Sequence, residues 1–368
     1  MRISTINIYN VDLPVVGGTY RMSLSAVSLL KSTVVEVITD SATVGYGETC
    51  PVGPTYAPEH VLGARAALAE IGPHLIGLDP RNLGLLHDAM DRALNGSRYA
   101  KAAVDIAAWD ICGKSYGRRV CDLLGGATGE TVPTYYSISV KEPEEAAREA
   151  KERQAEGFKR LQLKIGGRDV EEDIETIRRV AEVREPGTKL AADANRALTS
   201  RDAIALSEQC RDIPFVLEQP CGSLAELAGL RHRLHHPLYL DELGTDVNAV
   251  MHAVSSGLVD GFGHKLTRVG GISAMRTIRD ICAAGSMPHT CDDSWGGDII
   301  AAACVHVGAT VAPSRFDGAW IAAPYIQEHY DEENGPRIEN GRIKVPTGDG
   351  LGVVPDVARF GAPILSFS

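Results

Sequence analysis

The chain has 368 residues, of which 44% are apolar and 23% are charged, and its formal net charge is −11 at pH 7. This composition is typical of a globular protein larger than one ordinary domain. The negative charge argues against nucleic acid or an anionic membrane as a general partner, and no apolar run approaches the length of a membrane span.

The cysteines and the N-terminus indicate where the protein is found. The eight cysteines are scattered without a Cys-x-x-Cys pair, and Cys112, Cys282 and Cys304 lie in apolar helical patterns, which predicts core thiols. The first residues alternate like a strand and lack the features of a signal peptide. We therefore expect a cytoplasmic, reduced protein.

The first third of the chain is predicted to be an α+β segment. Apolar residues alternate as in strands over 3–12 and 33–40. Helical spacing follows over 60–71, 81–94 and 97–115. The last of these helices has a face of small residues, which predicts close packing, and Ser97 is its candidate N-cap.

From Val132 onward the pattern changes to strands that alternate with helices, which predicts a parallel sheet. Five short apolar runs in succession each end in a charged residue: Lys164, Asp193, Glu218, Asp241 and Lys265. The acidic members recur at about the length of one strand plus one helix of a (β/α) barrel, whose strand ends converge on one mouth. Three carboxylates in that position would bind a hard divalent cation, for which we expect Mg²⁺.

This constellation resembles the enolase superfamily, in its muconate lactonizing enzyme-like branch. The resemblance covers essentially the whole chain and implies an α/β fold, a modified (β/α)7β TIM barrel with an N-terminal α+β capping domain. The capping domain would span 1–126 and be completed by the tail 348–368, and the barrel with the catalytic site would span 127–347. Two capping-domain loops, near 15–24 and 49–59, would fold over the barrel mouth, with Tyr56 directed to the substrate.

The chemistry expected of these residues is proton transfer next to a carboxylate. Removing such a proton creates an enediolate, whose charge a bound Mg²⁺ stabilises. Lys164 and Lys265, on predicted strands two and six, would face opposite sides of the substrate α-carbon, which is the geometry of a two-base 1,1-proton transfer with inversion. Asn195 and Gln219 would support the metal ligands.

Departures from related members narrow the substrate. Many relatives carry Lys-x-Lys on strand two, but the first position here is Gln162, which could hydrogen-bond the substrate carboxylate. Mandelate racemase-like members use a His–Asp pair from strands seven and six. Because position 265 on strand six is Lys here, His289 is interpreted as a packing residue of strand seven. The segment "RFDGAW" lacks the Asp-x-Asp pair of the dipeptide epimerases, which argues against a dipeptide substrate.

Aromatic residues near the predicted mouth suggest a cationic substrate. An aromatic face beside a carboxylate holds a quaternary ammonium, which has no N–H to donate. Asp292 would supply the charge and Trp320 the face, with Trp295 and Tyr56 as further walls. The stretches "ETCPVGPTYAP", "LEQPC", "CDDSWGGDIIAAAC" and "YDEENG" are similar to the family's betaine epimerases, which implies 2-epimerisation of 4-hydroxyproline betaine or proline betaine.

Alternatives remain at this point. Dehydration of a hydroxyproline would use the same lysines, as would another lysine-type racemase or cycloisomerase of the family. A barrel that binds metal without catalysis would lack at least one of the five charged residues, and all five are present. The sequence leaves open the ring substituent and the preferred stereoisomer. By the habit of the family we expect a homo-oligomer.

Overall fold

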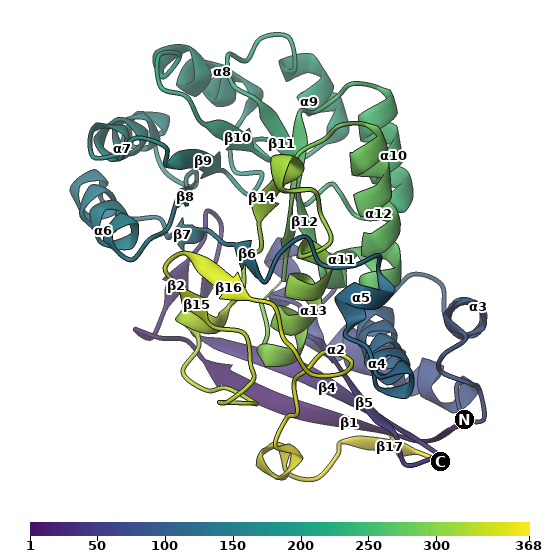
Figure 1. Cartoon of the computed structure of the whole chain (residues 1–368). Coiled ribbons are helices and arrows are strands. Elements are labelled where there is room, and N and C mark those ends of the chain that lie inside the picture. The colour runs from purple at the N-terminus through teal and green to yellow at the C-terminus, as the bar shows by residue number, and fades with distance from the viewer. Residues whose placement is uncertain (294) are drawn as a thin grey trace.

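The computed structural model of the chain describes residues 1–293 and 295–368. Figure 1 shows an antiparallel sheet that contains the N-terminus and, above it, a barrel surrounded by helices. The predicted α/β class, with a barrel and a separate N-terminal α+β part, is confirmed. The exact boundaries at 126 and 347 stay a prediction.

The N-terminal sheet has the strand order β17-β1-β4-β5. Its strands are β1 (Ile3–Pro14), β4 (Leu29–Thr39), β5 (Val44–Thr49) and β17 (Leu365–Phe367), and a small hairpin is formed by β2 (Tyr20–Arg21) and β3 (Ala26–Val27). Strand β17 pairs with β1 through Ile6 and Phe367. The C-terminal tail thus returns to the edge of the N-terminal sheet.

Five α-helices and a short 3₁₀ turn accompany this sheet. They are α1 (Gly53–Tyr56), α2 (Val61–Ile71), η1 (Gly72–His74), α3 (Leu83–Ala93), α4 (Arg98–Tyr116) and α5 (Val120–Leu123). Helix α4 packs closely on β5, because a Cβ at Gly47 would clash with the backbone of Ala103. Ser97 stands at the N-cap position, but its side chain makes no capping bond within the part of the chain that the structure describes; the carboxylate of Glu59 accepts the amides of Arg98 and Tyr99 instead.

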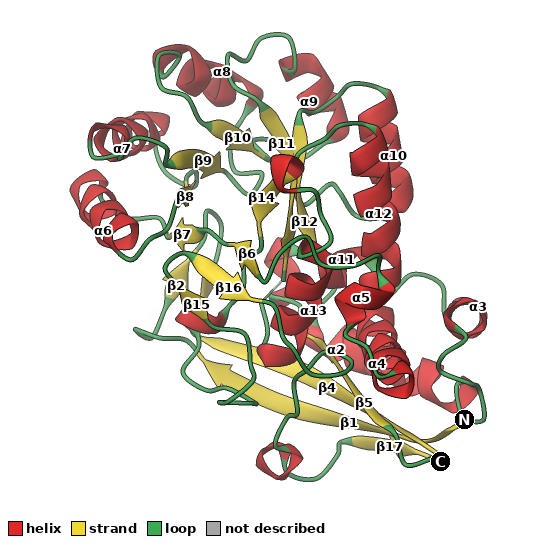
Figure 2. Ribbon diagram, viewed as in Figure 1, coloured by secondary structure: helices red, strands yellow, loops and turns green. Residues whose placement is uncertain are grey.

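The second part is an eight-stranded sheet in which every neighbouring pair is parallel (Figure 2). Its strands are β7 (Tyr136–Ile138), β8 (Arg160–Lys164), β9 (Lys189–Asp193), β10 (Val216–Glu218), β11 (Leu238–Leu240), β12 (Gly261–Lys265), β13 (His289–Asp292) and β14 (Phe316–Gly318). An isolated parallel bridge between Thr134 and Ala319 links the two ends of the strand order. The sheet therefore closes as a barrel.

Helices connect the strands of the barrel. They are α6 (Pro143–Ala155), α7 (Val170–Glu182), α8 (Ser200–Gln209), α9 (Leu224–Leu230), α10 (Val247–Ser255), α11 (Leu266–Val269), α12 (Ile272–Ala284) and α13 (Asp298–Gly308). The remaining elements are β6 (Thr131–Pro133), β15 (Ile338–Glu339), β16 (Arg342–Lys344), η2 (Pro313–Arg315), η3 (Ala323–Tyr325) and η4 (Val357–Phe360).

The core thiols that the sequence predicts are confirmed. All eight cysteines, including Cys112, Cys282 and Cys304, are buried free thiols. Within the described ranges, no helix combines the length and apolarity that a membrane span requires.

Candidate active site

Three carboxylates lie together at one end of the barrel. Asp193 ends β9, Glu218 ends β10, and Asp241 directly follows β11. All three are buried, and one carboxylate oxygen of each lies within 4.8 Å of the others. The register pairs Glu218 with Asp193, so both side chains leave neighbouring strands on the same face. The structure thus brings together the acidic residues that the sequence pattern singled out.

The donor set of this triad fits a divalent cation. Glu218 Oε1 is buried and has no hydrogen-bond partner among the described residues. Burial, and then the negative charges of Asp193 and Asp241, raise the pKa of Glu218 to about 8. Clustered carboxylate oxygens are the ligands that Mg²⁺ uses in proteins, and a cation would relieve their mutual repulsion. Asp193, Glu218 and Asp241 would hold it.

Two lysines flank the triad from opposite sides. Lys164 ends β8 and Lys265 ends β12, and three strands separate β8 from β12 in the barrel order. Lys164 Nζ donates to Asp193 Oδ2, and Lys265 Nζ lies 3.6 Å from Asp241 Oδ2. Burial alone lowers the pKa of each lysine, but the neighbouring carboxylates outweigh it, so both pKa values are raised.

Polar side chains orient two carboxylates of the triad, those of Asp193 and Glu218. The amide of Asn195 donates to Asp193 Oδ2 at 3.1 Å, and Gln162 Nε2 donates to Glu218 Oε2 at 2.8 Å. Gln162, which the sequence placed at the substrate carboxylate, therefore lies in the cavity wall and also contacts the triad.

The triad has two further neighbours that sequence reasoning missed. Arg268 donates to Asp241 Oδ1 at 2.5 Å, and the charges of Arg268 and Lys265 overcome the effect of burial to hold the pKa of Asp241 near 2. Glu242 accepts from Asn195 at 3.1 Å. Arg268 follows Lys265 by three positions in "KLTRVGG", and Glu242 directly follows Asp241. This closeness in sequence to predicted site residues was the available signal that they could contact the triad.

A small cavity of about 30 Å³ adjoins the lysines and the triad. It is lined by Tyr20, Met22, Tyr56, Tyr135, Ser137, Gln162, Lys164, Lys265, Asp293, Trp295 and Trp320. Tyr56 donates to Asp241 Oδ2 at 3.2 Å, and the rings of Trp295 and Trp320 meet edge to face with centroids 5.1 Å apart. Both lysines therefore line a space to which tyrosine and tryptophan rings contribute a large part of the wall.

The two aspartates at the end of β13 have different positions. Asp292 does not line the cavity; it accepts from Lys265 at 3.1 Å, from Tyr135 at 2.9 Å and from the backbone amide of Trp320 at 2.9 Å. Asp293 lines the cavity and accepts the backbone amides of Trp295 and Ala322. Asp292 thus lies behind Lys265, and the carboxyl group that faces the cavity is that of Asp293.

The sequence matches two family profiles and several known enzymes. Residues 5–125 match the profile of the mandelate racemase/muconate lactonizing enzyme N-terminal domain, and residues 145–359 match that of the enolase C-terminal domain-like family. A cis-3-hydroxy-L-proline dehydratase of Roseibium aggregatum is 37% identical over the full length of both chains. A hydrophobic dipeptide epimerase of Enterococcus faecalis is 30% identical over 72% of this chain and 75% of the relative.

A solved structure has the same overall fold. An enolase superfamily member from Roseovarius nubinhibens complexed with magnesium superposes with a TM-score of 0.95 at 33% identity, covering 100% of this chain and 99% of the other.

Proposed function

This chain belongs to the mandelate racemase/muconate lactonizing enzyme family of the enolase superfamily, and we propose that it is a Mg²⁺-dependent 2-epimerase of 4-hydroxyproline betaine or proline betaine. The relatives include epimerases, racemases and dehydratases, so an enzyme of this general type is established by the comparison. The observation that carries the proposal is the placement of two lysines on opposite sides of a carboxylate triad, beside a cavity with aromatic walls.

The lysines would divide the reaction between two faces of one carbon. One lysine, as the free amine, takes the α-proton and so breaks the Cα–H bond; the other, as the ammonium ion, delivers a proton to the opposite face and forms the new Cα–H bond. The proton count is unchanged and the configuration is inverted. A divalent cation held by the triad would stabilise the negative charge that develops on the substrate carboxylate and would offset the carboxylate charge beside the lysines.

The cavity walls support a cationic substrate without N–H donors. Tyr20, Tyr56, Tyr135, Trp295 and Trp320 supply aromatic surface, which attracts a quaternary ammonium through the ring faces. Asp293 is buried at the same cavity and forms no ion pair with a described residue. Burial raises the pKa of Asp293, and a nearby substrate cation would act in the opposite direction and favour its ionised form.

One specific observation favours a second candidate, dehydration of cis-3-hydroxy-L-proline. The full-length relative from Roseibium aggregatum is named for that reaction. A dehydratase would begin with the same α-proton abstraction and then expel the 3-hydroxyl group, so the lysines and the triad serve both candidates. Another racemase or cycloisomerase of the family would use the same residues with a substrate that carries no cationic group.

One experiment separates these functions. The purified enzyme is incubated in D₂O with Mg²⁺ and, separately, with 4-hydroxyproline betaine, proline betaine and cis-3-hydroxy-L-proline, and each mixture is followed by NMR. Deuterium at the α-carbon together with appearance of the 2-epimer of a betaine is the expected result, and chelation should abolish it. Loss of water from cis-3-hydroxy-L-proline, with no reaction of either betaine, would replace the epimerase by the dehydratase.

A further inference from the structure

A second cavity, of about 240 Å³, lies at the other end of strand β13. His289 begins this strand and lines the cavity, whereas Asp292 ends the strand beside Lys265. They lie three positions apart in an extended strand, which is roughly 10 Å. The cavity therefore opens at the opposite end of the strand from the catalytic lysines and is separate from the candidate active site.

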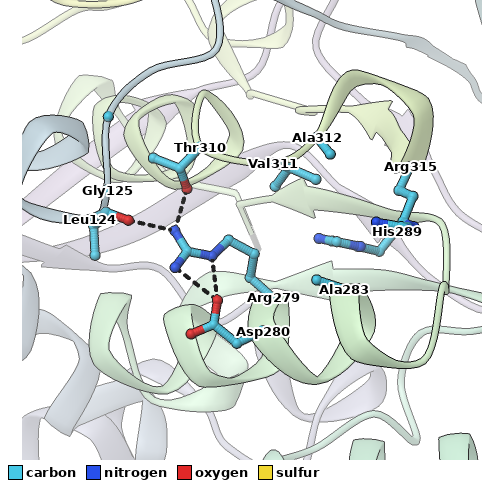
Figure 3. A pocket seen from close by; sticks show the side chains of 11 residues that line it. Leu124, Gly125, Arg279, Asp280, Ala283, His289, Thr310, Val311, Ala312 and Arg315 are labelled. Atoms are coloured by element: carbon cyan, nitrogen blue, oxygen red, sulfur yellow. Dashed lines mark hydrogen bonds and ion pairs between the residues drawn. The ribbon is translucent and has the colours of Figure 1, made fainter.

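Arg279 of α12 builds one wall of this cavity (Figure 3). Its guanidinium group donates to the carbonyl of Leu124 at 3.0 Å and to Thr310 Oγ1 at 2.5 Å. It also forms an ion pair with the exposed carboxylate of Asp280 at 2.9 Å. Because these contacts occupy most of its donors and balance its charge, Arg279 is mainly structural and ties three segments of the wall together.

His289 presents an unused acceptor to the cavity. The side chain is 2% exposed, and Nδ1 lies 3.3 Å from the carbonyl of Met287, so Nδ1 carries the proton that this contact requires. Nε2 is then the nitrogen with a free lone pair, and it has no partner among the described residues. In the view of Figure 3 the ring is directed into the pocket, between Arg279 and Arg315. A buried acceptor in this state calls for an O–H or N–H donor.

Arg315 supplies a positive charge that the protein does not balance. It lines the cavity from η2, contacts Ser286 Oγ at 3.4 Å, and forms no ion pair with a described residue. The other walls are short apolar side chains, including Ala283, Val311 and Ala312. Judged by the described residues, the cavity thus combines a cation without an ion-pair partner, a buried acceptor without a donor and an apolar surface.

We propose that this cavity is a second binding site, which takes a small hydroxycarboxylate whose carboxylate pairs with Arg315 and whose hydroxyl donates to His289 Nε2. The volume of about 240 Å³ lies just below the range of roughly 300–1,000 Å³ that is usual for pockets with drug-sized ligands, so it suits one small organic acid. An anion alone leaves the acceptor of His289 unsatisfied, and a neutral alcohol leaves Arg315 without a counter-charge. The two groups therefore select a ligand that carries both functions.

The test uses three probes of equal carbon number: L-lactate, propionate and 1,2-propanediol. Each is titrated into the full-length enzyme labelled with ¹⁵N-histidine, and binding is followed by the His289 Nε2 resonance, which is identified by its loss in His289→Phe. L-Lactate is expected to bind most tightly and to move this resonance. Arg315→Gln should weaken lactate binding about tenfold or more, since it removes one charge-assisted contact.

Arg201→Gln is the matched control, because Arg201 has a side chain that is 87% exposed and does not line the cavity. It should bind lactate as the wild type does. Lactate bound only at the active site would leave the His289 resonance unmoved and give wild-type affinity in Arg315→Gln, and this outcome would overturn the proposal. Equal binding of propionate and lactate would also overturn it, because the acceptor of His289 would then have no role.

Discussion

The neighbouring carboxylates determine where the ammonium groups of Lys164 and Lys265 lie. Each is paired with buried carboxylates, Lys164 with Asp193 and Lys265 with Asp292. These contacts fix both ammonium groups at the cavity without placing them side by side. Their positions on β8 and β12 predict that each lysine serves one face of the substrate carbon.

A stereochemical prediction follows from this placement. Lys164→Ala should stop solvent exchange of the α-proton from one enantiomer by at least about a hundredfold while affecting the other less, and Lys265→Ala should show the reverse preference. Neither variant should interconvert the isomers. Exchange from each pure enantiomer in D₂O, measured by NMR, gives the answer; a single variant that still epimerises at a near wild-type rate would refute the two-base arrangement.

A second prediction concerns the space beside the triad. A Cβ atom at Gly263 would lie 2.5 Å from Glu218 Oε1, the oxygen without a partner. Gly263→Ala should therefore displace this oxygen and weaken Mg²⁺ binding by about tenfold or more, with a parallel loss of activity. Isothermal titration with Mg²⁺ measures this directly.

Gly229→Ala provides the matched control for the substitution at Gly263. A Cβ at Gly229 meets no atom of the described residues within 4 Å, so Mg²⁺ affinity should be unchanged. Equal Mg²⁺ affinity in both variants would exclude Glu218 Oε1 as a ligand.

A third prediction concerns the proposed cation site, and it distinguishes the roles of the two aspartates at the end of β13. A desolvated cation–π contact contributes about 2 kcal/mol, so Trp320→Ala should raise KM for the betaine more than tenfold, and Trp320→Phe less. Asp293→Asn should likewise raise KM. Asp292→Asn should instead lower kcat, because Asp292 holds Lys265 at 3.1 Å. Steady-state kinetics checks the split; an unchanged kcat/KM in Trp320→Ala would remove the cation site.

Strands and helices were the part of the fold that the sequence predicted best. Apolar runs with charged ends predict parallel strands that meet at one mouth, and the acidic residues of the triad are observed there. Within "CDDS", however, adjacent strand residues point to opposite sides, so the pattern could not tell whether Asp292 or Asp293 faces the cavity. Likewise, Glu59 replaces Ser97 as the cap of α4 through a contact 39 residues away, which local sequence cannot reveal.

Helix α13 carries a pH-sensitive contact between elements. His306 Nδ1 accepts the amide of Cys121 at 3.3 Å and Nε2 donates to the carbonyl of Leu351 at 3.0 Å, so the neutral ring joins α5, α13 and the tail. Burial lowers the pKa of His306 to about 4. An unfolded histidine titrates near 6.5, so between these values the unfolded chain binds the extra proton and stability falls as pH falls.

The expected size of this effect is measurable. Lowering the pH from 7 to 5 should reduce the free energy of unfolding by about 2 kcal/mol through His306. His306→Gln cannot titrate and should lose correspondingly less over the same interval, whereas substitution of the exposed His74 by Gln should leave the wild-type loss intact. Urea unfolding midpoints at both pH values test this, and an equal loss in His306→Gln and the wild type would disprove it.

At the scale of the whole molecule, the buried carboxylate of Glu48 joins the N-terminal part to the barrel, and no sequence motif predicts this contact. Glu48 lies in "GYGETC", and its carboxylate accepts hydrogen bonds from the amides of Gly297 and Ile300 at the start of α13 and from the hydroxyl of Tyr330. These partners lie more than 240 residues away in the sequence. Such pairings depend on the completed fold, and periodicity in a single chain carries no information about them.

Arg196 connects the barrel to the loop that carries Tyr56. It follows β9 and donates to the carbonyls of Thr55 and Tyr56 at 3.1 and 2.9 Å. It also lies 3.6 Å from Glu242 beside the triad. Tyr56, at the end of α1, lines the cavity beside the two lysines. Arg196 therefore helps to hold the N-terminal part closed on the barrel mouth.

Arg196→Ala should loosen this closure without unfolding the barrel. We expect KM for the substrate to rise by about three- to tenfold and amide exchange over residues 53–58 to accelerate, because two hydrogen bonds to a charged donor are lost at a short helix. Arg201→Ala is the control and should change neither quantity, because the Arg201 side chain is 87% exposed and, among the described residues, forms an ion pair only with the adjacent Asp202. Hydrogen exchange read by mass spectrometry, together with steady-state kinetics, tests both effects in one preparation. Faster exchange with an unchanged KM would show that this loop does not contribute to substrate binding, and unchanged exchange would show that Arg196 does not hold it.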